Sequence, residues 1–107
     1  MRKTTISWSY RARRDLLDIG DFIARDKPEA AARWLGQIID AIERAAVLPT
    51  AGRVVPEAGR DDVREIILDH YRIVYQTRGN EIIVLTIFEG RKLLSGLVIE
   101  RDRPGQR

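Results

Sequence analysis

The chain has no cysteine and only one histidine, His70, among its 107 residues. Without cysteine, neither a disulfide framework nor a thiolate metal site can form, and one histidine cannot build a zinc site alone. We therefore expect a protein that uses neither a metal nor another cofactor. The absence of cysteine also fits a reducing compartment such as the cytosol.

Long apolar runs are missing as well. The apolar stretches are only a few residues long, and Met1-Arg2-Lys3 leads into a strand-like segment rather than into the apolar core of a signal peptide. We expect a soluble, cytoplasmic protein that does not bind membranes. With 44% hydrophobic and 33% charged residues, the chain fits one compact domain over residues 1–107, of which residues 100–107 are expected to fray.

Lysine is scarce too. Lys3, Lys27 and Lys92 are the only lysines, so arginine supplies most of the positive charge. Planar guanidinium groups favour two-point contacts with carboxylates or phosphates and tolerate partial burial better than ammonium groups do. The net charge of +3 and the pI near 9.7 suit an acidic partner or a nucleic acid but are too modest to establish either.

The first half of the chain has the patterns of one strand and two helices. Alternating polar and apolar residues predict a strand from Thr4 to Trp8. Apolar residues at steps of three and four predict a helix from Tyr10 to Arg25, after an N-cap at Ser9, and a second helix from Pro28 to about Leu48. So short a connection between two amphipathic helices favours an antiparallel hairpin.

The second half of the chain predicts three strands. They run from Val63 to Leu68, from Tyr71 to Arg78 and from Glu81 to Phe88, and two-residue connections join them. The order β-α-α-β-β-β predicts an α+β fold in which an antiparallel twisted sheet packs against an N-terminal helical hairpin. Residues 49–62 are predicted to form a loop. The segment from Leu93 to Ile99 is apolar enough to dock as a strand or a short helix.

Arginines lie within these predicted strands. Arg72 is expected on the open face of the sheet, away from the helices, and Arg64 could come near it across the strand pair. Two adjacent like charges repel each other, so an anion would have to lie between them. That anion could be Glu65, Glu81 or Glu89 of this chain, or a phosphate or carboxylate of a partner.

A series of short patterns follows in order along the chain: Ala12 with Asp15-Leu16, Pro28 with Ala31-Ala32, Leu48-Pro49, Gly52-Arg53, Val55-Pro56-Glu57, Arg64-Glu65, Tyr71-Arg72-Ile73-Val74-Tyr75 and Gly90-Arg91-Lys92. In this order they resemble the RelE/ParE toxin superfamily, over about residues 5–95. The resemblance implies the toxin half of a toxin–antitoxin pair. It also implies the order of elements that the periodicity predicts.

The superfamily has two branches. RelE-like members cut messenger RNA on the ribosome, a reaction that needs a base, an acid and cations at the scissile phosphate, whereas ParE-like members are not nucleases and poison DNA gyrase. By resemblance, Arg72 matches the strand arginine of the RNase motif and Arg91-Lys92 match its basic pair. The tyrosine that should follow is absent from residues 93–98, and no tyrosine or histidine lies after Tyr75.

The resemblance therefore implies the ParE-like branch, a non-catalytic inhibitor of DNA gyrase with no catalytic residues. The residues expected to recognise the target or an anion are Arg64, Arg72, Glu89, Arg91 and Lys92. Two alternatives stay open: a RelE-like, ribosome-dependent mRNA endoribonuclease, in which Glu89 could act as a base, and a degenerate, non-toxic binding module. His70 is expected in a turn, away from Arg91.

Such a toxin is silenced by a cognate antitoxin, which in the family is commonly encoded by the adjacent gene and wraps the toxin with a C-terminal segment. The resemblance thus implies a hetero-oligomer of toxin and antitoxin. A groove along the helical hairpin and any exposed sheet edge are the surfaces that accept an amphipathic helix and an added strand. Arg13, Arg33 and Arg44, on the predicted helices, would meet acidic residues of the antitoxin.

Overall fold

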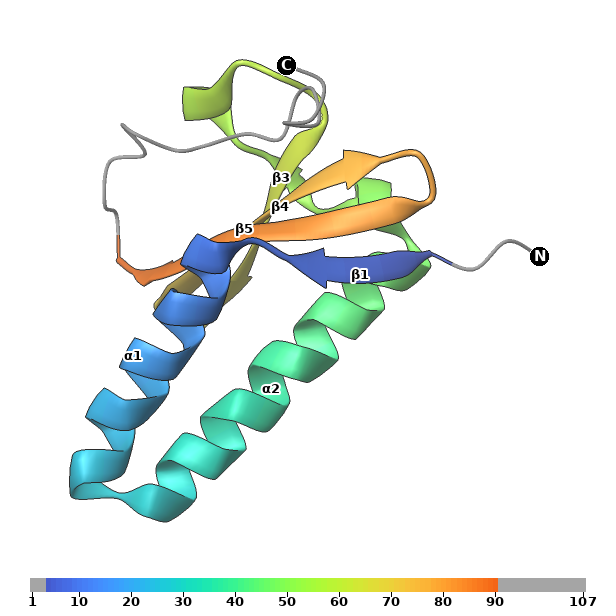
Figure 1. The fold of residues 1–107 in the computed structure, drawn as a ribbon. Helices are drawn as coiled ribbons and strands as arrows, with labels where there is room; N and C mark the ends of the chain where they lie inside the picture. Colours follow the sequence, from blue (N-terminus) through green and yellow to red (C-terminus); the bar gives the residue numbers. More distant parts are fainter. Residues whose placement is uncertain (1–3, 91–107) are drawn as a thin grey trace.

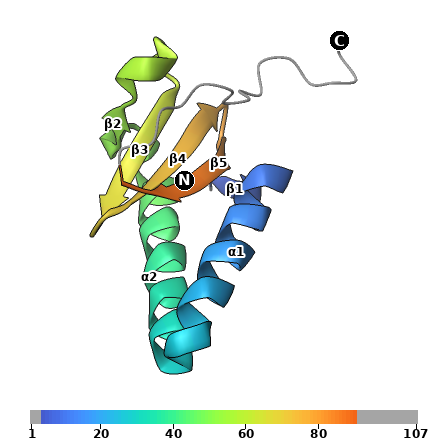
Figure 2. The same ribbon diagram turned by 90° about the vertical axis from the view of Figure 1, so that its left-hand side faces the viewer.

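The computed structural model describes residues 4–90, which form a sheet and a helical hairpin packed on one of its faces (Figure 1). The end of the hairpin at which the two helices join extends away from the sheet, as Figures 1 and 2 both show. The predicted α+β fold is confirmed. Within residues 4–90, neither helix has the length and apolar character that crossing a membrane requires.

The hairpin consists of helix α1 (Tyr10–Asp26) and helix α2 (Pro28–Val47), which Lys27 alone joins. Ser9 caps α1, because its side-chain oxygen accepts a hydrogen bond from the backbone N–H of Ala12 at 3.0 Å. Pro28 begins α2 at a position where a backbone N–H would have no helical partner. The predicted hairpin is confirmed, and each helix ends within one residue of its predicted end.

The sheet contains the predicted strands but is not wholly antiparallel. Strands β3 (Val63–Leu68), β4 (Tyr71–Arg78) and β5 (Glu81–Glu89) form an antiparallel meander. Strand β1 (Thr5–Trp8) pairs with β5 in the parallel direction, so the predicted antiparallel sheet is in fact mixed. The physical reason is that β1 leads into the hairpin rather than into a tight turn, so no turn forces it to run antiparallel to its neighbour.

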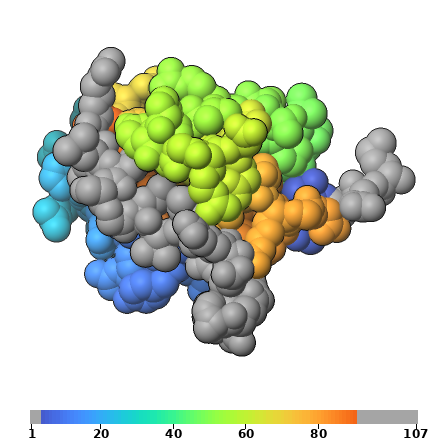
Figure 3. All heavy atoms as spheres, turned by 90° about the horizontal axis from the view of Figure 1, so that it is seen from above, coloured from blue at the N-terminus to red at the C-terminus, as the bar shows by residue number. Residues whose placement is uncertain are grey.

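The predicted loop, residues 49–62, contains a further short strand and is here called the strap. Strand β2 (Arg53–Val54) pairs antiparallel with Arg64 and Glu65 of β3, which gives the strand order β1-β5-β4-β3-β2. Turns of 3-10 helix precede and follow β2. Figure 3 shows the strap, in green, on the upper surface of the molecule. Two residues are too few for a periodic pattern, so the sequence could not predict this strand.

Both faces of the sheet carry buried apolar side chains. The larger cluster lies between the sheet and the hairpin, and its largest members are Trp34, Ile38, Ile42, Ile73, Tyr75, Ile82 and Ile87. A smaller cluster occupies the opposite face and consists of Val55, Val63, Val74, Ile83, Leu85 and Phe88. Val55 and Ala58 of the strap pack into the smaller cluster. The strap is therefore part of the fold rather than a free loop.

Several predictions fall on residues that the structure does not describe. The docking segment from Leu93 to Ile99, the fraying of residues 100–107, and the basic pair Arg91 and Lys92 all lie outside residues 4–90. The organisation of residues 1–107 as one domain likewise stays a prediction.

Candidate functional site

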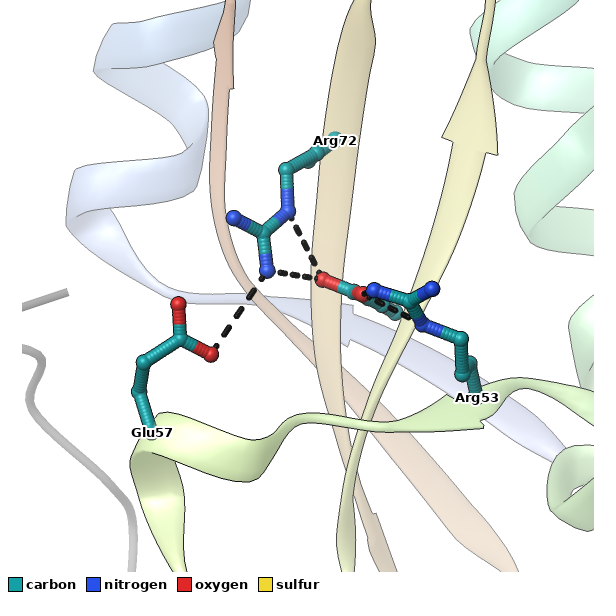
Figure 4. A network of polar contacts seen from close by, with 4 residues as sticks. Arg53, Glu57 and Arg72 are labelled. Atoms are coloured by element: carbon teal, nitrogen blue, oxygen red, sulfur yellow. Dashed lines mark hydrogen bonds and ion pairs between the residues drawn. The ribbon is translucent and has the colours of Figure 1, made fainter. Parts of the chain in front are cut away.

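A cluster of charged side chains lies on the face of the sheet opposite the hairpin, which we call the open face (Figure 4). At its centre Glu65 of β3 accepts hydrogen bonds from two arginines. Arg53 of β2 contacts Glu65 Oε2 through Nε at 2.9 Å and through Nη2 at 2.7 Å. Arg72 of β4 contacts Glu65 Oε1 through Nε at 2.8 Å and also through Nη2. The Glu65 side chain is fully buried, so both of its oxygens depend on these arginines.

Arg72 is enclosed by further partners. Its Nη2 lies 3.8 Å from Glu57 Oε1 of the strap, and its guanidinium carbon lies 5.2 Å from the centre of the Phe88 ring. Only 11% of the Arg72 side chain is exposed, against 69% for Arg53. The positive charge of Arg72 is therefore balanced within the chain, by one buried and one partly exposed carboxylate.

Arg64 does not lie beside Arg72, which corrects the sequence prediction. It is opposite Tyr75 in the strand pairing, whereas Arg72 is opposite Ile67. Successive side chains of β3 point to opposite faces, so Arg64 and its neighbour Glu65 cannot both reach the open face. The anion at Arg72 is Glu65 of this chain, one of the alternatives that the sequence left open.

Arg64 instead holds the strap in place. Its guanidinium donates hydrogen bonds to the backbone oxygens of Asp61 at 3.0 Å, Thr50 at 2.8 Å and Gly52 at 3.0 Å. The Tyr75 hydroxyl donates another to the backbone oxygen of Pro49 at 2.7 Å, and burial raises the pKa of this hydroxyl. A recognition role for Arg64 stays a prediction, since these contacts give it a structural role.

The strap is also fixed at its far end. Arg60 donates two hydrogen bonds to Asp62, from Nε at 2.8 Å and from Nη2 at 2.6 Å. Gln76 of β4 donates from Nε2 to Asp62 Oδ2 at 3.0 Å. The Arg60 contact, assisted by Gln76, holds the pKa of Asp62 below its ordinary value.

Groups capable of proton transfer lie at the turn between β3 and β4. His70 is in this turn, as predicted, and its Nε2 lies 3.3 Å from Glu89 Oε2. Both side chains are well exposed, at 64% and 63%. A pocket of about 430 Å³ opens beside them, and the described residues that line it are Arg53, Ile67, Asp69, His70, Arg72 and Gly90. Residues 4–90 contain no group of acidic and histidine side chains that could hold a metal ion.

The predicted antitoxin-binding arginines are exposed on the hairpin. Arg13, Arg33 and Arg44 form no ion pair with any residue of 4–90, whereas Arg11 and Arg14 lie near acids one turn along α1. Arg33 and Arg44 are three helical turns apart and so share one flank of α2. Arg13 instead shares a stripe with Leu17, which lines a groove of about 290 Å³ between the helices. The three arginines therefore belong to two separate surfaces.

Sequence reasoning missed the central part of the charged cluster. The sequence indicates Glu65 only as one of several possible anions, and it predicts no role in the site for Arg53 or Glu57. The sequence does contain a signal for Glu65. It is an acid in a predicted strand, and the apolar residues Val63 and Ile67, two positions away on either side, lie on the same face of that strand. A buried acid requires a cationic partner, and the arginines of the strap and of β4 were available.

Comparisons with known proteins agree with the resemblance found in the sequence. Residues 6–94 match the family described as the ParE toxin of the type II toxin–antitoxin system parDE. Y4kP, a candidate toxin of Sinorhizobium fredii (strain NBRC 101917 / NGR234), is 34% identical over 95 residues, which cover 86% of this chain and 94% of that protein.

Solved structures share the fold. The chromosomal ParDE toxin–antitoxin system of P. aeruginosa matches with a TM-score of 0.69 and 22% identity, over 83% of this chain and 98% of that one. The RelBE2 toxin–antitoxin complex of Mycobacterium tuberculosis matches with a TM-score of 0.51 and 18% identity, over 84% of this chain and 100% of that one. At these identities the structural matches establish the fold and nothing more.

Proposed function

The chain belongs to the ParE toxin family of type II toxin–antitoxin systems, and we propose that it acts on DNA gyrase as a non-catalytic inhibitor. The family assignment supports this target, since the ParE-like branch is the one that poisons gyrase. The proposal also places the protein in the cytoplasm, where gyrase works.

The observation that carries the non-catalytic part of the proposal is the environment of Arg72. In an RNA-cleaving site, a cation must be free to face the negative charge that develops on the scissile phosphate. Arg72 is the residue that matches the strand arginine of the RNase motif, but it is 11% exposed and bonded to the buried Glu65. Two of its three guanidinium nitrogens bond to Glu65 Oε1, so a phosphate could use them only by displacing Glu65, which would leave that oxygen of a buried carboxylate without its partner.

One observation favours a second candidate, a ribosome-dependent mRNA endoribonuclease. His70, paired with Glu89, lines the same pocket as Arg53 and Arg72. A histidine positioned by a carboxylate is a suitable general base for a 2′-hydroxyl. The exposed guanidinium of Arg53 could then supply some positive charge.

We also propose that a cognate antitoxin neutralises the toxin by binding the hairpin. The two solved relatives described above are toxin–antitoxin systems, which supports such a partner. Arg13, Arg33 and Arg44 are among the cations of the hairpin that form no ion pair within residues 4–90. Acidic side chains of the antitoxin would complete these ion pairs and form a hetero-oligomer.

The decisive experiment compares the two targets with one preparation of the chain, separated from any antitoxin. The gyrase proposal expects inhibition of supercoiling and accumulation of cleaved DNA, while ribosome-bound messenger RNA stays intact. The His70→Gln variant serves as the control, because it removes the candidate base and leaves the charged cluster in place. Cleavage of ribosome-bound message by the original chain, lost in His70→Gln, together with unaffected gyrase, would reverse the choice.

A further inference from the structure

The side of α2 that faces away from the sheet, here called the outer face, carries four charged residues of alternating sign. In chain order they are Glu29, Arg33, Asp40 and Arg44, and all four are exposed. Successive residues of an α-helix are about 100° apart, so these four lie within about 60° of one another, on the side away from the buried Ile38. In Figures 1 and 2, α1 is the only element of residues 4–90 beside the part of α2 that extends away from the sheet.

The four charges do not neutralise one another within the chain. Glu29 and Arg33 are one helical turn apart, as are Asp40 and Arg44, a spacing at which ion pairs form along a helix. Within residues 4–90, however, none of the four takes part in an ion pair. The outer face therefore offers two acids and two arginines to a partner.

The alternating order makes the outer face complementary to a second copy of itself. Two α2 helices can lie antiparallel about a twofold axis that passes midway between Arg33 and Asp40. Arg33 of one copy then lies opposite Asp40 of the other, because the two are equally distant from the axis. Glu29 likewise lies opposite Arg44 of the other copy. The twofold axis repeats each contact, so the face forms four ion pairs with its own copy.

Gly36 lies beside this axis, near the middle of α2. A side chain at this position would meet no other atom of the chain, so the fold itself does not require a glycine there. A glycine in the interior of a helix nevertheless costs stability relative to alanine. The absence of a side chain would let the backbones of two crossing helices approach closely. Gly36 thus suits a contact with a second helix better than it suits the fold of a single chain.

We propose that two copies of the chain pair through the outer faces of their α2 helices, antiparallel about a twofold axis beside Gly36. Val47, which is 83% exposed, lies on the same face and adds apolar area at each end of the contact. The contact is otherwise mainly electrostatic, so the dimer is weak and sensitive to salt. The inference goes beyond the proposed function and does not depend on the target. Because Arg33 and Arg44 are also proposed to meet the antitoxin, dimerisation and antitoxin binding would compete for them.

Disulfide cross-linking tests the geometry, because the chain has no cysteine of its own. In the proposed dimer the two copies of Gly36→Cys are about 1.5 Å apart along the helix axes and face each other, within reach of a disulfide. Val47→Cys is the matched control on the same face, since its two copies would be about 32 Å apart along the axes.

Each cross-linking rate is divided by the rate at which the same thiol reacts with a small disulfide reagent, which corrects for its reactivity. We expect the corrected rate of covalent dimer formation to be at least about tenfold higher for Gly36→Cys than for Val47→Cys. Equal corrected rates for the two variants would overturn the proposed pairing of the helices.

Charge reversal tests the ion pairs by sedimentation velocity at low salt, on the full chain separated from any antitoxin. Arg33→Glu places an acid opposite Asp40 of the other copy, so we expect the dimer dissociation constant to rise at least about tenfold. Arg13→Glu is the control, because Arg13 is on α1 and outside the outer face, and it should leave dimerisation unchanged.

Exchanging the two charges tests the register. A chain with both Arg33→Glu and Asp40→Arg keeps opposite charges face to face, so its dissociation constant should return to within about threefold of the original. A double variant as weak as Arg33→Glu alone would overturn this register. An original chain that stays monomeric at low salt up to about 1 mM would overturn the proposal, and would leave the gyrase and antitoxin proposals intact.

Discussion

The two faces of the sheet are held by different forces. On the face toward the hairpin, apolar side chains of both layers interlock, and the charged residue Arg64 bonds only to backbone oxygens of the strap. On the open face, the buried Glu65 depends on the side chains of Arg53 and Arg72, beside a smaller apolar cluster. The hairpin face is stabilised mainly by apolar burial, whereas the open face also depends on mutual neutralisation of charges.

The difference separates two arginines that look alike in the sequence. Both arginines lie in strands: Arg64 precedes Glu65, and Arg72 follows Tyr71. The sequence predicts that both recognise the target or an anion. Arg64, on the hairpin side of the sheet, bonds to the start of the strap at Thr50 and Gly52. Arg72 neutralises a buried acid on the open side. A charged residue in a strand can therefore serve the fold even where its position suggests a binding site.

Removing the central acid should have the largest effect. Glu65→Ala leaves Arg72 almost buried without its main partner, and we expect the free energy of unfolding to fall by about 3–5 kcal/mol. Urea unfolding measures the change. Glu57→Ala is the matched control, because Glu57 is more exposed and 3.8 Å from Arg72, and should cost less than about 1 kcal/mol. Similar losses in the two variants would mean that Glu65 is not the principal partner of Arg72.

Two neighbouring residues of β4 compare the apolar clusters on the two faces. Ile73 packs toward the hairpin and Val74 toward the open face, and neither side chain is exposed. Ile73→Ala should lower the free energy of unfolding by about 2–5 kcal/mol, and Val74→Ala by about 2 kcal/mol because fewer carbons are removed. Chemical denaturation of both variants provides the comparison. A negligible loss for Val74→Ala would show that the open-face cluster does not stabilise the fold.

The elements of the fold were predictable because their patterns are long. The stripe from Leu16 to Ile23 and the alternation from Tyr71 to Arg78 each extend over enough residues to define a period. Strand β2 has two residues, and its existence depends on pairing with β3 rather than on its own sequence. The parallel direction of β1 likewise depends on which strand it reaches after the chain has folded.

The charged cluster was less predictable, because the sequence of one strand does not determine its register with the neighbouring strand. Sequence alternation places Arg72 on the open face, but which residue of β3 lies beside it depends on the turn between the strands. The register that the structure shows brings Glu65 within reach of Arg72 and leaves Arg64 on the other face. Arg53 and Glu57 are in the strap, whose path over the sheet has no periodic pattern to reveal it.

A smaller effect is expected where the strap passes Tyr75 on the hairpin side. A side-chain carbon at position 52 would collide with the Tyr75 hydroxyl, so Gly52→Ala should destabilise by about 1–3 kcal/mol. Gly36→Ala is the control, because nothing obstructs a side chain there, and in the middle of α2 it should stabilise by up to about 1 kcal/mol. Thermal unfolding of the two variants should therefore shift in opposite directions. A Gly52→Ala protein as stable as the original would mean that the strap can move away from Tyr75 freely.

The smallest effect concerns the ion pair at the far end of the strap. Because Arg60 and Gln76 hold the pKa of Asp62 below its ordinary value, Asp62 binds fewer protons in the folded protein than in the unfolded one over the intervening pH range. Its contribution to stability is thus complete above the ordinary value of about 3.9 and is lost as the pH falls through the lower, folded value.

Urea midpoints of the original chain and of Asp62→Asn, compared between about pH 7 and pH 2, would measure this contribution. We expect the gap between the two proteins to stay constant down to about pH 4 and then to narrow. Since Asp62 is partly exposed, the gap should be below about 1 kcal/mol at neutral pH. A gap that widens toward acidic pH would mean that the fold disfavours the ionised form of Asp62. In that case Glu65, rather than paired charges in general, would account for the difference between the two faces of the sheet.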